Sequence, residues 1–212
     1  MTKILRAVCL NSVDYRDNDR LLILLSAEQG KTVARIRSVK SPKSKLKAAA
    51  APNCYAEYTL SEKGGYSTVT GAEVIEQFFG TWTSPDKNLA AGAVTEVLEK
   101  FTRENVPAEN EFTAGLNALF KINYAEGTPY IHTLRFLIGF MPLIGLDLSD
   151  AELSRHARAL FNAVSNADED ELDCLEYEVG DVVFGIAEAG RIISAFSGEK
   201  FKTLSAFASF TR

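Results

Sequence analysis

The chain has 212 residues, of which 46% are hydrophobic and 24% are charged, and its formal net charge is -5. This composition is ordinary for a globular protein and excludes a disordered or fibrous chain. The charge is unevenly distributed: residues 1–80 hold 12 Lys and Arg against 8 Asp and Glu, whereas the remaining residues hold 11 against 20. The change of sign predicts two modules with different partners, the basic one being the candidate for a polyanion.

Targeting signals are missing from the sequence. Arg6 interrupts the apolar run at the start of the chain, which does not fit a signal peptide. The longest run without charge, Phe136–Leu146, is too short to span a bilayer. The cysteines Cys9, Cys54 and Cys174 are widely spaced and odd in number, which predicts free thiols in a reducing compartment. We therefore expect a cytoplasmic protein that does not contact a membrane.

The first 80 residues have the pattern of strands. Short runs rich in strand-forming residues lie at Ile4–Val13, Leu21–Ser26, Thr32–Val39, Tyr55–Leu60 and Ser67–Phe78. Lys63-Gly64-Gly65 is a hairpin-turn signal between the last two runs. Five short strands in this length match a small closed barrel, of which the OB-fold is the common five-stranded case. Between the third and fourth strands, Leu46 and an alanine run predict a short helix at Ser44–Ala51.

The third run alternates in its side chains. One face carries Val33, Arg35, Arg37 and Val39, and the other carries Thr32, Ala34, Ile36 and Ser38. The alternation is imperfect, because Val33 and Val39 share a face with the arginines.

Beyond Gly80 the apolar residues recur with the period of a helix. The first expected helix begins after the cap Ser84, the second contains Phe112–Phe120, and the third begins at Thr128–Pro129 and ends at Pro142. A fourth begins at the capping box Ser149–Glu152, and a fifth begins in the acidic run Asp168–Asp173. The last two are expected at Val182–Ile193 and Phe201–Phe210. The predicted fold class is therefore α+β in two parts. An OB-fold barrel domain at residues 1–80 precedes an all-α helical bundle at residues 81–212, which we expect to bind partners.

Signatures of catalysis and metal binding are missing from the sequence. It contains no Walker A loop, GxGxxG, GxSxG or HExxH motif. His132 and His156 have no Cys or His at ligand spacing. The carboxylates Asp14, Asp17, Asp19 and Glu28 are interleaved with Arg16 and Arg20, which predicts a solvated loop rather than a cation site. We expect no enzyme activity, no cofactor and no metal site.

The positive charge of the first module is concentrated in KTVARIRSVKSPKSKLKAAAAP, residues 31–52, which holds seven basic residues and no acid. On the third strand of an OB barrel and the linker that follows it, such a segment indicates a nucleic-acid-binding face. The candidate phosphate-binding residues are Arg20, Lys31, Arg35, Arg37, Lys40, Lys43, Lys45 and Lys47. The candidates for base stacking are Tyr15, Tyr55 and Tyr58, with Tyr66 as a further tyrosine of these strands.

Several segments carry a resemblance to a known family. They are Ala7–Leu10 with Asp14–Leu22, Gln29–Lys31, Pro42–Lys47 followed by the alanines and Pro52, and Leu134–Leu148 with its Gly145-Leu146-Asp147-Leu148 ending. As an ordered set they resemble the bacterial recombination mediator family RecO. The N-terminal likeness covers about 80 residues and is the more specific part.

The resemblance implies a function in DNA repair and recombination. It implies binding of single- and double-stranded DNA, annealing of complementary strands, and help in loading the RecA recombinase onto DNA coated with single-strand binding protein. It also implies RecR as a partner. Many members carry four zinc-binding cysteines after the Asp-Leu pair, but Leu148 here leads directly to Ser149 and Asp150. We therefore expect a member without zinc.

The same resemblance implies that the helical half receives the acidic C-terminal tail of single-strand binding protein, whose end is apolar. A receptor for such a tail needs an apolar groove with a cation at its mouth. The candidate cations are Arg135, preferred for its bidentate geometry, and Lys121. The alternative for Arg135 is a structural ion pair with Glu96 or Glu99.

Two other functions fit the basic segment. It could serve an acidic protein tail, with no nucleic acid involved, or an RNA, as in an OB-fold factor for ribosome assembly. Competition between single-stranded DNA and an acidic peptide would distinguish the first alternative from DNA binding. Tighter binding of strands that carry a 2′-hydroxyl would distinguish the second.

Overall fold

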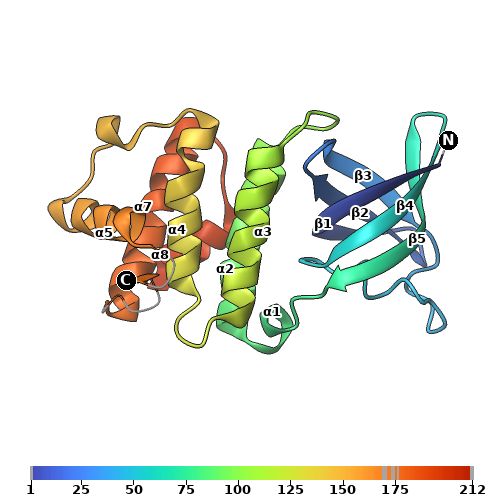
Figure 1. The fold of residues 1–212 in the computed structure, drawn as a ribbon, viewed down its shortest axis with the longest axis horizontal. Coiled ribbons are helices and arrows are strands. Elements are labelled where there is room, and N and C mark those ends of the chain that lie inside the picture. Colours follow the sequence, from blue (N-terminus) through green and yellow to red (C-terminus); the bar gives the residue numbers. More distant parts are fainter. Residues whose placement is uncertain (1, 169–170, 173–174, 176, 211–212) are drawn as a thin grey trace. The chain divides into compact units, whose positions relative to one another are not determined.

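The computed structural model describes residues 2–168, 171–172, 175 and 177–210. The chain divides into two compact units. The first contains residues 1–79 and 98–116, and the second contains residues 80–97 and 117–212. Figure 1 shows that the first unit is built on a strand barrel and the second on helices. The predicted fold class, a five-stranded barrel followed by a helical bundle, is confirmed.

The barrel closes because its first strand pairs on both sides. The strands are β1 (Thr2–Tyr15), β2 (Asp19–Ser26), β3 (Gly30–Ile36), β4 (Tyr55–Lys63) and β5 (Tyr66–Glu76), in the order β1-β2-β3-β5-β4. The first half of β1 pairs with β4 and its second half pairs with β2. The two pairings meet at Val8, and a bulge between Cys9 and Asn11 interrupts the pairing with β2 just after it. Bulges bend a strand, which is what lets one strand serve both neighbours.

Alternation along β3 sets the inside and the outside of the barrel. Thr32, Ala34 and Ile36 are buried, whereas Val33 is exposed and Arg35 is half-buried. Side chains therefore alternate between inside and outside over β3, whereas Val39, on the arginine face of the expected run, is buried. The strand ends at Ile36, so Arg37 to Val39 lie in the turns that follow.

Tyr58 occupies the centre of the barrel core. Its side chain is fully buried, and its hydroxyl donates a hydrogen bond of 2.7 Å to the carbonyl oxygen of Ala49. Val39, Ala49 and Ala50, from the segment between β3 and β4, belong to the same core. Burial raises the pKa of the Tyr58 phenol well above its usual value, so the hydroxyl stays a donor at any physiological pH.

The short helix predicted at Ser44–Ala51 is not formed, and that prediction is wrong. The segment makes successive turns, in which the amide of Ala50 donates to the carbonyls of Leu46 and Lys47, both at 3.2 Å. Burial of Ala49 and Ala50 against the core sets the path of this backbone. This tertiary contact outweighs the helix propensity of the alanines.

A loop between two helices covers the turn between β2 and β3. The amide of Lys31 donates to the Arg103 carbonyl (3.0 Å), and the amide of Asn105 donates to the Lys31 carbonyl (3.2 Å). Gly30 has a φ of 60°, and a Cβ added there would lie 1.9 Å from the carbonyl oxygen of Val106. Glycine is required at this position on both grounds. These contacts group residues 98–116 with the barrel, and the predicted domain boundary after Gly80 stays a prediction.

The helices follow the predicted order. They are α1 (Gly80–Thr83), α2 (Pro85–Phe101), α3 (Glu109–Tyr124), α4 (Tyr130–Phe140), the short 3₁₀ turns η1 (Pro142–Ile144) and η2 (Leu148–Asp150), α5 (Arg155–Asn166), α7 (Val179–Ser197) and α8 (Lys202–Phe210). Ser84 accepts from the Lys87 amide at the start of α2, as predicted. α4 ends just before Pro142, also as predicted, because proline cannot continue the hydrogen-bond ladder.

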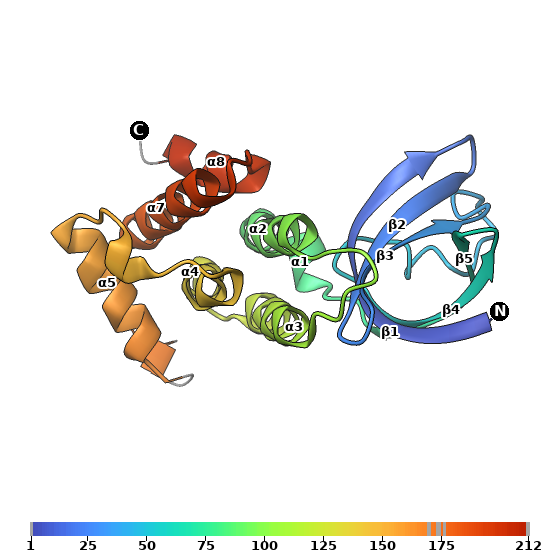
Figure 2. The ribbon, with the colours of Figure 1, turned by 90° about the horizontal axis from the view of Figure 1, so that it is seen from above.

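Within the second unit, α4 packs against α5 and α7, and α7 packs against α8. Figure 2 shows α7 and α8 side by side. Glu96 of α2 caps the N-terminus of α8, since its carboxylate accepts from the amides of Lys202 (2.7 Å) and Thr203 (2.8 Å). Among the described residues, no helix combines the length and apolarity that a membrane span needs.

The capping box predicted at Ser149–Glu152 is wrong. The side chain of Asp147 accepts the Ser149 amide, which confines this stretch to the turn η2. The cap of α5 is Ser154, whose Oγ accepts from the Ala157 amide at 3.1 Å. In the acidic run, the Glu171 amide donates to Asp168, and the helix start expected there lies partly outside the described residues.

The described cysteines are free and buried. Burial raises the pKa of the Cys54 thiol to about 12 and that of the Cys9 thiol further still. Neither forms the reactive thiolate at neutral pH. Cys174 lies outside the described residues.

Changing Tyr58 to Phe should lower the free energy of unfolding by about 1–3 kcal/mol, because the buried Ala49 carbonyl loses its donor while the ring packing is kept. Urea unfolding followed by circular dichroism measures this. Tyr66→Phe is the matched control, because Tyr66 is 80% exposed and its hydroxyl is in solvent. Equal stabilities of the two variants would show that the Tyr58 hydroxyl does not hold the segment.

Candidate nucleic-acid interface

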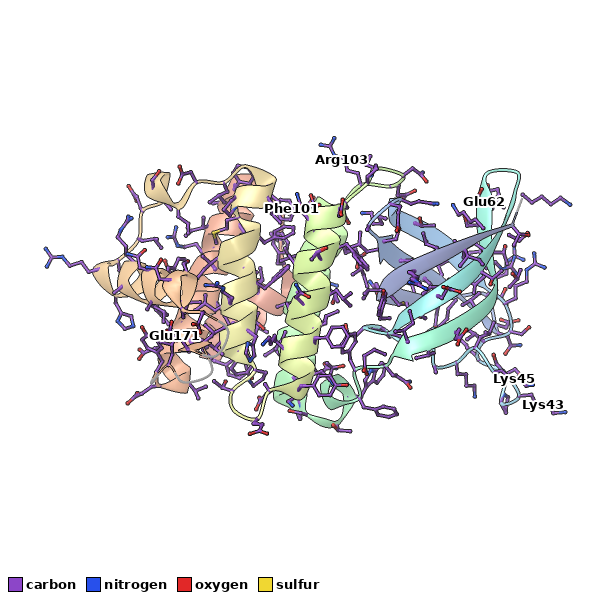
Figure 3. The ribbon with its side chains drawn as sticks, in the orientation of Figure 1. Lys43, Lys45, Glu62, Phe101, Arg103 and Glu171 are labelled. Carbon is purple, nitrogen blue, oxygen red and sulfur yellow. The ribbon has the colours of Figure 1, made fainter. Side chains whose placement is uncertain are left out.

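The basic residues that follow β3 lie on a loop that is anchored at both ends. We call residues 37–47 the basic loop. Val39, near the start of the loop, is buried in the barrel core, and so are Ala49 and Ala50, which follow the loop. Short hydrogen-bonded turns shape it, including Ser44 N to Ser41 O at 3.0 Å. Figure 3 shows Lys43 and Lys45 projecting from the barrel into solvent. The loop therefore presents its cations from a fixed base.

Four cations of the basic loop are available to a ligand. Arg37, Lys43, Lys45 and Lys47 are exposed, and none of them makes an ion pair with the residues that the structure describes. Exposed Lys and Arg without acidic partners are the groups that contact phosphates in sequence-independent binding.

Three other predicted cations are ion-paired, contrary to the uncompensated charge that the segment's own sequence indicates. Arg20 Nε lies 3.1 Å from Asp14, and Lys40 Nζ lies 2.8 Å from the same carboxylate. Arg35 pairs with Asp19 through its Nε at 2.8 Å and a second guanidinium nitrogen. The acids come from the hairpin of β1 and β2, which also holds Arg20 and precedes Arg35 and Lys40 in the chain.

Asp19 fixes the point at which the chain leaves β3. Its second oxygen accepts the amide of Ser38 at 2.8 Å, and Ser38 has a φ of 49°, which serine rarely adopts. The Ser38 amide, and next the Arg35 guanidinium, hold the pKa of this carboxyl below its usual range. Because Asp19 is buried, the prediction of a fully solvated acidic loop is wrong for this residue.

The predicted stacking residues differ in what they can do. Tyr58 is buried in the core, so its prediction as a base-stacking residue is wrong. Tyr55 packs against Phe112 of α3, with ring centroids 6.1 Å apart. The Tyr15 ring contacts the guanidinium groups of Arg16 and Arg35 at 5.3 and 5.5 Å. A cation–π contact of this kind orients Arg35 as well as the ring.

Lys31 lies apart from the basic loop, at the other end of β3. Its amine donates to the carbonyl of Glu99 at 2.7 Å. It lines a polar cleft of about 410 Å³ together with Lys63 and the two acids Glu62 and Glu104. The charges of this cleft balance, so it is a poorer phosphate site than the basic loop.

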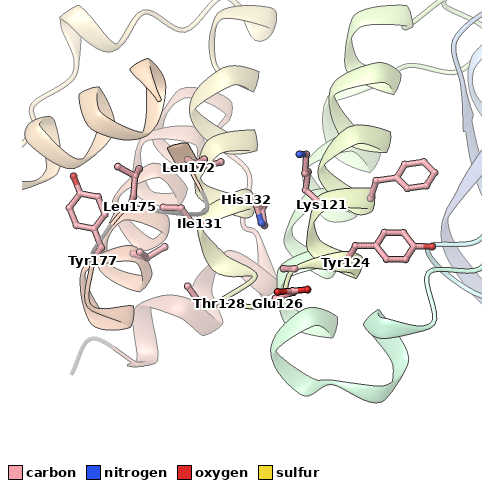
Figure 4. A pocket seen from close by; sticks show the side chains of 13 residues that line it. Lys121, Tyr124, Glu126, Thr128, Ile131, His132, Leu172, Leu175 and Tyr177 are labelled. Carbon is pink, nitrogen blue, oxygen red and sulfur yellow. The ribbon is translucent and has the colours of Figure 1, made fainter. Parts of the chain in front are cut away.

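The helical unit holds an apolar cavity of about 620 Å³ between its helices. Figure 4 shows two of the residues that line it, Lys121 of α3 and His132 of α4, between these helices. Leu172, Leu175 and Tyr177, which also line it, lie farther from α3. Phe120, Ile131 and Val182 complete much of the apolar lining. One predicted tail-binding cation, Lys121, therefore lines this cavity, and the acid Glu126 lines it too.

The other predicted cation, Arg135, is used within the fold. Its guanidinium donates to the carbonyl of Val164, in the last turn of α5. This contact replaces the ion pair with Glu96 or Glu99 considered from the sequence. Arg135 is not among the described residues that line the cavity, so Lys121 becomes the first candidate.

Comparison with known proteins matches both parts of the chain. Residues 1–78 match the family described as recombination protein O, N terminal, and residues 83–178 match recombination protein O, C terminal. The chain belongs to the RecO family. The resemblance that the sequence motifs carry is thereby confirmed.

Individual RecO relatives are moderately similar. The DNA repair protein RecO of Desulfitobacterium hafniense (strain DSM 10664 / DCB-2) is 36% identical over 120 residues, which cover 57% of this chain and 44% of the relative. The proteins of the same name from Syntrophomonas wolfei and Bacillus subtilis are 26% and 27% identical, over 66% of this chain and 58% and 54% of theirs. The chain thus spans about half the length of the curated relatives it matches.

Within the described residues of this RecO-family chain, no group of three or more His, Cys, Asp or Glu is placed to hold a metal ion. The expected lack of zinc stays a prediction. Sequence reasoning missed the roles of Asp14 and Asp19. For Asp14 the hairpin register was a signal, because Asp14 faces Arg20 across the hairpin. For Asp19 the register gives none, because its partners Arg35 and Ser38 do not face it across this hairpin.

Asp19 should make the fold sensitive to acid. A carboxyl whose pKa is lowered by folding contributes stability above its unfolded pKa of about 3.9 and loses it as the pH falls through the folded value. Asp19→Asn should lower the melting temperature at pH 7 and flatten the loss of stability below about pH 4.

The control for this prediction is Asp17→Asn. Asp17 lies in the same turn, is exposed, and makes no hydrogen bond or ion pair with described residues. Its variant should keep the melting curve and acid dependence of the parent. Identical curves for the two variants would show that Asp19 does not anchor the turn.

Proposed function

We propose that the chain binds DNA through the basic loop. The observation that carries the proposal is a set of four exposed cations that pair with no described acid, on a loop whose flanking residues are buried in the barrel core. Each exposed cation can neutralise one phosphate without breaking an internal contact. The loop reads no base, so it suits single- and double-stranded DNA alike.

The family supports a wider role in DNA repair and recombination. The relatives are named DNA repair proteins. We propose that this chain anneals complementary strands and helps to load the RecA recombinase onto DNA covered by single-strand binding protein, with RecR as a further partner. These are expectations from family membership, as is the lack of enzymatic activity.

The cavity of the helical unit supports one partner in particular, the C-terminal tail of single-strand binding protein. Apolar residues of the tail would enter the lining formed by Phe120, Ile131 and Val182. The tail's carboxylates would meet Lys121. An apolar anchor with an adjacent charge contact is a common mode of peptide recognition.

Replacing Arg37, Lys43, Lys45 and Lys47 together with Ala should weaken DNA binding about equally for all sequences. The salt dependence should also flatten, by about 0.7 per lost contact on single strands and so by about 3 in total. Fluorescence anisotropy with labelled single-stranded DNA, duplex DNA, RNA and an acidic peptide, each over a salt series, measures this.

The control carries the same change of charge in the helical unit. Arg155, Arg158, Lys200 and Lys202 are exposed there, and their fourfold Ala variant should bind DNA with the parent's salt slope. If both variants bind like the parent, the basic loop is not the DNA site. Tighter binding of RNA or of the acidic peptide than of DNA would favour one of the alternative functions.

Changing Lys121 to Ala should weaken binding of an acidic peptide with an apolar end about tenfold, because a charge-assisted contact is lost beside the cavity. DNA binding should be unchanged. Lys200→Ala, an exposed lysine in the same unit, is the matched control. Calorimetric titration of the peptide decides the matter, and undiminished binding by the Lys121 variant would place the tail elsewhere.

A further inference from the structure

The hairpin of β1 and β2 places one carboxylate between two cations. Asp14 accepts from Arg20 Nε at 3.1 Å and is 2.8 Å from Lys40 Nζ. Arg20 belongs to β2, and Lys40 belongs to the basic loop. The amide of Lys40 donates to the carbonyl of Asn18 at 3.2 Å, which holds the loop against the hairpin turn.

The two cations converge on one anion from different elements. A carboxylate and a phosphodiester group both present two charged oxygens to such a pair of donors. The carboxylate of Asp14 thus stands where a phosphate would be bound. We propose that Arg20 and Lys40 form a binding site for one phosphate of the DNA backbone, which Asp14 occupies in the free protein.

The exposure of Asp14 makes it replaceable. Its side chain is 65% exposed, and Lys40 and Arg20 are 30% and 37% exposed. Ion pairs this open to water are weak and are screened by salt. Asp19 differs, because only 10% of its side chain is exposed and it also binds the Ser38 amide. Asp19 holds the architecture, whereas Asp14 can be displaced by a phosphate.

The inference rests on the proposed DNA binding and adds a consequence to it. Asp14 keeps Arg20 and Lys40 together while no DNA is bound, and it competes with the phosphate for them. The contact therefore lowers the affinity for DNA while it preorganises the site. A polyanion already held by the four exposed cations of the basic loop has a high effective concentration at Arg20 and Lys40, so it can displace Asp14. A small single anion has no such second contact and displaces Asp14 less readily.

The test compares Asp14→Asn with Asp17→Asn. Both variants gain one unit of charge in the same turn, but only the first releases cations. Asp14→Asn should bind single-stranded DNA about three- to tenfold more tightly at low salt. Its salt dependence should steepen by about 0.7, because no displaced carboxylate takes up a counterion. Asp17→Asn should stay near the parent in both.

A further pair of changes ties the gain to the proposed site. Adding Arg20→Ala and Lys40→Ala to Asp14→Asn should remove the gain in affinity. Equal gains in the Asp14 and Asp17 variants would overturn the proposal, since charge alone would then explain them. A gain that survives loss of both cations would overturn it too, as would weaker binding by a folded Asp14→Asn protein. Asp14→Ser gives a second folded variant for the same comparison.

If the parent protein and all variants fail to bind DNA, the proposed function fails. The anion site is then tested alone, with inorganic pyrophosphate and the side-chain NMR signals of Arg20 and Lys40. In Asp14→Asn these signals should shift on addition of the anion, and in Asp17→Asn they should shift far less. Unchanged signals in Asp14→Asn would overturn the site itself.

Discussion

A buried hydrogen bond inside the barrel anchors the far end of the segment that carries the basic loop. Tyr58 donates to the Ala49 carbonyl from the middle of the core, and the alanines beside that carbonyl are buried with it. The backbone that leads to them cannot move without opening the core. The cations of residues 37–47 are therefore held by this packing after the loop and by the hydrogen bond from the Ser38 amide to Asp19 at its start, although the loop itself has no regular secondary structure.

Three acids of the β1–β2 hairpin have different roles in the electrostatics of the barrel. Asp19 is buried and fixes the point at which the chain leaves β3. Asp14 is exposed and pairs with both Arg20 and Lys40. Asp17 pairs with no cation among the described residues. The same hairpin thus contains a structural carboxylate and a replaceable one. This arrangement lets an acidic chain offer a basic surface, because the remaining cations of the loop are exposed and pair with none of the described acids.

Local patterns predicted the elements well, and they failed where tertiary contacts decide. The period-2 and period-3.6 patterns found the strands and helices, and Pro142 fixed the end of α4. The alanine run at Ser44–Ala51 and the cap at Ser149 were wrong, because burial in one case and the Asp147 side chain in the other set the backbone. The cations of the basic loop could be predicted from charge alone. The partners of Arg35 and Arg135 could not, because each lies on another element of the chain. The pairing of Arg20 with Asp14 was within reach, because the two residues face each other across one hairpin.

The loop that follows α2 covers one edge of β3, which matters for any fragment of the chain that lacks this loop. β3 pairs with β5 over only three residue pairs, from Ala34–Ser67 to Ile36–Val69. The earlier part of its edge is covered by Arg103 and Asn105, which satisfy both backbone groups of Lys31. An uncovered strand edge is a template on which another chain can add. A fragment that stops near residue 80 would expose that edge, so we expect it to self-associate more readily than the chain in which residues after the barrel cover the edge.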